Sequence, residues 1–120
     1  MEITPLIKED YVMLQEEATV SELIGKMKEK EKRAALIFRQ KKYLGLIEKK
    51  SLLHSKIDVT TTKIKNHIQH TPLLNQHADV IETAYLMYQS DLSVVPVEHD
   101  KEIIGVINAR DLVMLASELP

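Results

Sequence analysis

The chain repeats itself at a spacing of about 60 residues, and this repeat limits the possible folds more than any other feature. The segment Ala18-Thr-Val-Ser-Glu22 is echoed by Ala78-Asp-Val-Ile-Glu82. Internal repeats determine architecture before any local pattern does. A unit of about 60 residues buries too little apolar surface to be comfortably stable alone, so we expect the two copies to share a core. The predicted copies span residues 1–58 and 59–120.

The composition is that of an ordinary globular domain, with 44% apolar and 28% charged residues among 120. The net charge is −2, and the lysines of residues 26–33 and 41–50 are interleaved with glutamate, which argues against a nucleic-acid partner. The absence of cysteine excludes disulfides and thiolate metal sites. No apolar run reaches membrane-spanning length and the N-terminus lacks a signal pattern, so we expect a cytoplasmic protein without a membrane partner.

Each copy is predicted to begin its first helix at a capping residue. Thr19 is followed three residues later by Glu22, and Asp79 by Glu82. In such a capping box the first side chain accepts from a backbone amide of the first turn, while the acid reaches back. An apolar stripe at helical spacing follows in the first copy, formed by Val20, Leu23, Ile24 and Met27.

Two short apolar runs follow each predicted helix and flank a polar turn, which is typical of a β-hairpin. The runs cover residues 34–38 and 43–47 in the first copy, and residues 93–97 and 102–107 in the second. A second helix is predicted after each hairpin. In the second copy Asn108 stands at its N-cap, three residues before Asp111.

Proline and glycine mark three positions in these predicted strands. Pro96 has no amide to donate, so its strand must lie at a sheet edge or be interrupted there. Gly45 and Gly105 lie in mid-strand, which indicates a bulge or a close approach by another backbone or a ligand. For Gly105 we favour packing over ligand approach.

The resulting fold class is α+β, with two pseudo-symmetric β-α-β-β-α units packed through their small sheets. Residues 3–14 are expected to lead into the first unit and residues 64–74 into the second. Thr71 precedes Pro72 and is therefore expected to be extended.

This order of elements resembles the cystathionine β-synthase (CBS) domain, which occurs in tandem pairs called Bateman modules. The resemblance covers the whole chain and is carried by Thr71-Pro-Leu-Leu74, residues 78–82, Ser93-Val-Val-Pro-Val97 and Gly105-Val-Ile-Asn-Ala-Arg-Asp-Leu112. It implies a non-catalytic regulatory module that binds AMP, ADP, ATP or S-adenosylmethionine in a cleft between the copies. It also implies a homodimer, and no required cofactor.

The resemblance assigns roles to residues of the second copy. Asp111 would accept hydrogen bonds from the ribose hydroxyls, as a carboxylate with two oxygens can. Asn108 stands where the family has Thr or Ser, and the adjacent helix N-terminus offers amides to phosphate. The remaining implied ligand-binding residues are Arg110, Gly105, Ile107, Thr71, Pro72, Leu73, Val94, Val95 and Pro96.

Alternatives remain open for several of these residues. Asp111 can equally serve as a helix-capping carboxylate, and one residue can do both. The first copy has Glu48 and Ser51 at the positions of Asn108 and Asp111, so we expect at most one usable nucleotide cleft. These departures also motivate a second hypothesis, a structural or oligomerisation module with a vestigial cleft.

The sequence shows no constellation typical of an enzyme or a metal site. No serine has the context of a nucleophile with a base, and the three glycines are too far apart for a phosphate-binding loop. His67 and His70 are three residues apart, as a helical metal site would require, but no carboxylate completes the set. We therefore interpret the histidines as surface residues.

Overall fold

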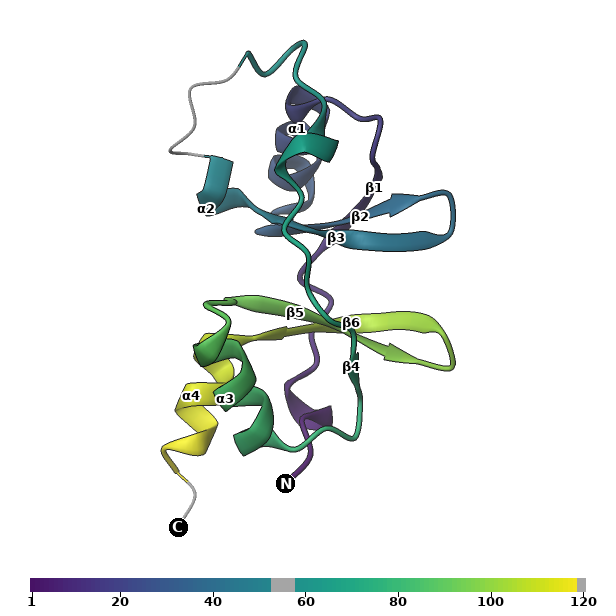
Figure 1. Ribbon diagram of the computed structural model, residues 1–120. Coiled ribbons are helices and arrows are strands. Elements are labelled where there is room, and N and C mark those ends of the chain that lie inside the picture. Colours follow the sequence, from purple (N-terminus) through teal and green to yellow (C-terminus); the bar gives the residue numbers. More distant parts are fainter. Residues whose placement is uncertain (53–57, 119–120) are drawn as a thin grey trace. The chain divides into compact units, whose positions relative to one another are not determined.

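The structure is a computed structural model that describes residues 1–52 and 58–118. It divides the chain into two compact units, which are considered separately (Figure 1). One unit comprises residues 10–70, and the other comprises residues 1–9 together with residues 71–120. The boundaries of these compact units thus differ from those of the predicted sequence repeats, 1–58 and 59–120.

The first unit is a three-stranded sheet with an accompanying helix. Strand β2 lies in the centre, parallel to β1 and antiparallel to β3. Val20, Leu23 and Met27 of α1 are buried in one apolar cluster with Ala35 and Ile37 of β2. The elements are β1 (Val12–Gln15), α1 (Val20–Lys30), β2 (Ala34–Arg39), β3 (Lys42–Glu48), α2 (Lys49–Leu52) and the 3-10 helix η2 (Ile64–His67).

The second unit repeats this topology, with β5 in the centre of the order β4-β5-β6. Its core combines Val80 and Met87 of α3 with Val95, Ile107 and Leu112. The elements are the 3-10 helix η1 (Thr4–Leu6), β4 (Leu74–Asn75), α3 (Val80–Gln89), β5 (Val94–His99), β6 (Glu102–Asn108) and α4 (Ala109–Ala116). The predicted α+β class and the β-α-β-β-α order of each unit are confirmed.

Helices α1 and α3 begin where the capping patterns predict. The Thr19 hydroxyl accepts a hydrogen bond from the Glu22 amide at 3.2 Å. The Asp79 carboxylate accepts from the amides of Ile81 and Glu82 at 3.0 and 3.1 Å. Each cap satisfies amides that the first helical turn leaves without an intrahelical partner.

Pro96 lies in β5, the central strand of its sheet, and β5 continues through it without a break, so the prediction of an edge strand or an interruption at Pro96 is wrong. Pro96 is paired with Val106, whose amide and carbonyl both bond Lys8 instead of β5. The proline nitrogen therefore faces the β4 side of the ladder. There, pairing begins only at Val97, opposite Leu74, so no hydrogen bond is lost at Pro96.

The two mid-strand glycines accommodate a close approach by backbone. A Cβ on Gly45 would lie 2.5 Å from the carbonyl oxygen of Gln69, and one on Gly105 would lie 2.7 Å from that of Lys8. Both distances are too short for a real Cβ contact, so the close packing requires glycine. The packing interpretation of Gly105 is confirmed.

Each core includes a residue from the lead-in segment of the other sequence repeat. Ile3 is fully buried in the core of the second unit, and its amide donates to the Ala78 carbonyl at 2.9 Å. Ile64 is fully buried in the core of the first unit, where its amide donates to the Ala18 carbonyl at 3.0 Å. The sequence analysis placed Ile3 in the lead-in to the first unit and Ile64 in the lead-in to the second, and for these two residues the structure shows the opposite unit.

Candidate functional site

Asn108 is the last residue of β6, and Asp111 lies on the first turn of α4. Both elements belong to the second unit and are labelled in Figure 1. The Asn108 side chain accepts a hydrogen bond from the Arg110 amide at 2.9 Å, so Asn108 is the N-cap of α4. Asp111 then occupies the third helical position, as the sequence pattern predicts. The arrangement places a carboxylate, a capped helix N-terminus and an exposed arginine side chain within one turn.

Asp111 forms an ion pair with Lys8, a contact that the sequence analysis missed. Lys8 Nζ lies 2.7 Å from Asp111 Oδ2, with 58% of the Lys8 side chain and 23% of the Asp111 side chain exposed. Oδ2 is buried and accepts no well-aligned hydrogen bond from the described residues, so the contact with Lys8 is electrostatic in character. Because 103 positions separate the two residues, no local spacing could have indicated the pair.

The hydrophobic residues of β5 and β6 that were predicted to bind the ligand are buried. Val95 and Ile107 are opposite each other in the ladder, and both are fully buried in the core of the second unit. Val94 and Pro96 are also buried. A part for these side chains in ligand binding stays a prediction.

Thr71, Pro72 and Leu73 lie immediately before β4, in the same unit as Asp111. Thr71 and Leu73 are half-buried and Pro72 is exposed. The structure thus keeps all the predicted ligand-binding residues within one compact unit. It adds Lys8 to them, since residues 1–9 belong to the same unit.

The corresponding position in the first unit has different chemistry. Glu48 stands in the place of Asn108 and is only 8% exposed. The Lys50 ammonium lies 3.7 Å from the Glu48 carboxylate, and the Ser51 hydroxyl donates to the Glu48 backbone carbonyl at 2.7 Å. A buried carboxylate here would repel an anionic ligand, and the expectation that this position does not bind a nucleotide stays a prediction.

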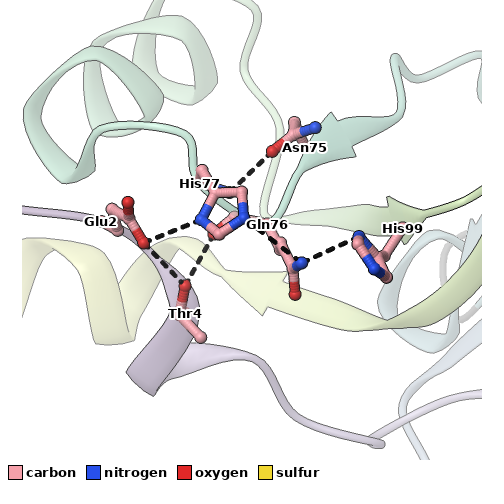
Figure 2. A network of polar contacts seen from close by, with 6 residues as sticks. All are labelled: Glu2, Thr4, Asn75, Gln76, His77 and His99. Carbon is pink, nitrogen blue, oxygen red and sulfur yellow. Dashed lines mark hydrogen bonds and ion pairs between the residues drawn. The ribbon is translucent and has the colours of Figure 1, made fainter.

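Two of the histidines belong to a polar network on the second unit (Figure 2). The Gln76 side-chain nitrogen lies 2.8 Å from His99 Nδ1, and the Gln76 backbone carbonyl accepts from the Thr4 hydroxyl at 2.8 Å. His77 Nδ1 lies 3.0 Å from the Glu2 carboxylate. The contact with His77 holds the pKa of Glu2 below its usual value. Figure 2 shows that this network joins the N-terminal segment to the segment after β4 and to the end of β5.

Within residues 1–52 and 58–118, no group of three or more metal-binding side chains is brought together. His67 is half-buried and His70 is exposed, with His70 Nδ1 lying 3.1 Å from the Leu44 carbonyl oxygen. His54, the remaining histidine of the sequence, lies outside the described residues.

The family model of the CBS domain matches residues 3–58 and, a second time, residues 63–118. The chain belongs to the CBS-domain family. It carries two copies of the domain, as its internal repeat indicates. A comparison with curated proteins finds no match.

Solved CBS-domain structures share the fold. The hexameric CBS-CP12 protein from bloom-forming cyanobacteria is similar with a TM-score of 0.83 and 20% identity, covering 100% of this chain and 76% of that one. A CBS domain pair/ACT domain protein from Thermotoga maritima has a TM-score of 0.72 and 17% identity, covering 98% of both chains. A putative signal-transduction protein with CBS domains from Burkholderia ambifaria has a TM-score of 0.76 and 19% identity, covering 92% of this chain and 85% of its own.

At these identities the structural likeness shows the fold, and the family supplies the general role. A CBS domain pair is generally a regulatory module, and CBS domains of a transcriptional regulator from Streptococcus pneumoniae are also among the similar structures. Such domains are generally non-catalytic. Among the described helices, none combines the length and the apolar character needed to cross a bilayer.

Proposed function

We propose that this CBS domain pair is a non-catalytic sensor that binds an adenosyl ligand, such as AMP, ADP, ATP or S-adenosylmethionine, at Asp111. The observation that carries the proposal is the position of the Asp111 carboxylate. It lies on the first turn of α4 and retains 23% exposure of its side chain. A partly shielded carboxylate is well suited to accept hydrogen bonds from a vicinal diol, because charge-assisted bonds are strongest where water competes least.

The first turn of α4 supplies the complementary chemistry for phosphate. The amides of Ala109 and Arg110 already donate to the Ser93 carbonyl and the Asn108 side chain, but the helix dipole still gives this N-terminus a partial positive charge. The Arg110 side chain is exposed on the same turn and adds a full positive charge. One segment thus presents an acceptor for ribose next to donors for an anion.

Calorimetric titration with AMP, ADP, ATP and S-adenosylmethionine tests the proposal. We expect at least one of the four to bind with measurable heat and to raise the melting temperature, since a ligand that binds only the folded state stabilises it by mass action. Neither heat nor a thermal shift with any of them at millimolar concentration would contradict the proposal.

A second candidate function, a self-associating structural module, is favoured by an exposed apolar surface on α3 and α4. Ile81, Tyr85 and Tyr88 of α3 are 51%, 62% and 85% exposed, and Val113 and Met114 of α4 are 63% and 57% exposed. Clustered large apolar residues commonly mark an interaction surface. The occupant we propose is a second copy of this chain, which forms a homodimer through this surface.

The exposed residues of α1 in the first unit contrast with this surface. They include Glu22, Lys28 and Glu29, which are costly to bury in an interface. The hexameric assembly named for the cyanobacterial relative shows that a CBS-domain protein can self-associate. The exposed residues of α3 and α4 include large apolar side chains, whereas those of α1 include several charged ones, and this difference supports α3 and α4 as the proposed dimer contact.

Replacing both Tyr85 and Met114 by glutamate is expected to convert a dimer into a monomer, because both charges would need to be desolvated in the contact. Sedimentation velocity over a concentration series measures the change. Ile24→Glu on α1 is the control, since Ile24 is 38% exposed in the other unit, and it should leave the dimer intact. A wild-type monomer at every concentration, or a double variant that dimerises like the wild type, would argue against this contact.

A further inference from the structure

Lys8 lies against the carboxylate to which the proposed function assigns the ribose, yet that function gives Lys8 no role. Its ammonium is 2.7 Å from Asp111 Oδ2. More than half of the Lys8 side chain is exposed, so a molecule that approaches Asp111 can contact this side chain. A ligand that hydrogen-bonds to Asp111 must therefore encounter Lys8.

The backbone fixes Lys8 at this position independently of its side chain. The Lys8 amide donates to the Val106 carbonyl at 3.0 Å, and the Val106 amide donates to the Lys8 carbonyl at 2.8 Å. Gly105 allows this approach because a Cβ there would meet the side chain of Ile7 and the carbonyl of Lys8. The ammonium is thus tethered near Asp111, and a substitution of the side chain leaves both backbone hydrogen bonds available.

Binding of a ribose changes the electrostatic environment of this ammonium. A diol that donates hydrogen bonds to Asp111 competes with Lys8 for the same carboxylate. The Lys8 ammonium then loses part of its electrostatic attraction to Asp111. An ammonium has three N–H donors, and a phosphate attached to that ribose supplies acceptors for them. Adenosine carries no phosphate. S-adenosylmethionine carries a positive sulfonium at the 5′ carbon of its ribose, where AMP carries its phosphate.

We propose that Lys8 is a specificity-determining residue that restricts the Asp111 site to phosphate-bearing adenosyl ligands. It would select AMP, ADP or ATP over adenosine and S-adenosylmethionine. This inference rests on the proposed function and deepens it. The structural reasons are the 2.7 Å ion pair, the exposure of the Lys8 side chain and the paired backbone of Lys8.

The test compares AMP, adenosine and S-adenosylmethionine on wild type and three variants by calorimetry. Wild type should bind AMP more tightly than the other two. Lys8→Met should reduce the preference for AMP over adenosine about tenfold, or about 1.4 kcal/mol. Lys8→Arg should keep the preference, because the charge remains. Lys65→Met is the matched control, since Lys65 forms an exposed ion pair with Glu17 at 3.5 Å in the other unit, and it should behave like wild type.

The outcomes separate this inference from the proposed function. If Lys8→Met keeps the wild-type ratio of AMP to adenosine affinity, or if wild type binds S-adenosylmethionine as tightly as AMP, the selectivity inference is wrong and the adenosyl site stands. If AMP, adenosine and S-adenosylmethionine all fail to bind wild type, and ADP and ATP fail as well, both proposals are wrong. Circular dichroism and the melting temperature of each variant establish that it is folded.

Discussion

Asp111→Asn is expected to weaken binding of an adenosyl nucleotide at least tenfold and to remove most of the ligand-dependent rise in melting temperature. The reason is that the substitution removes the charge and replaces one of two acceptor oxygens with a donor. Hydrogen bonds to a charged group contribute about 1.5–3 kcal/mol each, so the loss of one suffices for this effect. Calorimetry and thermal unfolding with and without nucleotide measure it.

The variant should remain folded, because the pair that it breaks is partly exposed. The Lys8 side chain is 58% exposed, and ion pairs of that kind contribute about 0–1 kcal/mol. Asp100→Asn is the matched control in the same unit. Asp100 lies in the β5–β6 turn with φ of 49°, a left-handed conformation that asparagine tolerates, and its carboxylate is 89% exposed. Equal nucleotide affinity in Asp111→Asn and Asp100→Asn would eliminate Asp111 as the ribose acceptor.

Ile3→Ala is expected to destabilise the second unit by about 2–5 kcal/mol, the range typical of truncating a fully buried isoleucine. Ile3 has no exposed surface and packs in one cluster with Val80, Val95 and Leu112. Urea unfolding measures the change in free energy. Hydrogen exchange locates it, since amides of α3 and β6 should exchange faster while those of α1 and β2 change less.

Two further variants make this prediction specific. Ile81→Ala changes the same residue type in the same unit, but Ile81 is 51% exposed, so its cost should stay within about 0.5 kcal/mol. Ile64→Ala should reverse the exchange pattern, because Ile64 is buried in the core of the first unit. Should Ile3→Ala cost no more than Ile81→Ala, the burial of Ile3 in this core would be disproved.

Local sequence patterns predicted most of the fold, because local physics determines those elements. The caps at Thr19, Asp79 and Asn108 depend on a side chain and amides two or three residues away. The glycine requirement at Gly105 was also readable, since glycine in a strand signals a close approach. The capping pattern that begins at Asn108 placed Asp111 on the first helical turn, where the structure has it.

Contacts between distant segments could not be predicted in this way. The pairing of Lys8 with Asp111 and the burial of Ile3 against residues of α3 and α4 depend on tertiary placement, which leaves no periodic trace in the sequence. The same holds for Pro96. A central strand accepts proline there because β4 is two residues long, and the length of a neighbouring strand is not encoded near Pro96.

The placement of residues 1–9 in the second unit has a consequence for how the chain is made. Residues 10–70 form a continuous stretch that can collapse as soon as it leaves the ribosome. Ile3 and Lys8 precede residues 10–70 in the chain, whereas their partners on β6 and α4 follow that stretch. Residues 1–9 therefore cannot join the second unit until β6 and α4 have been synthesised, and we expect the closure of this long loop to be slow compared with the collapse of residues 10–70.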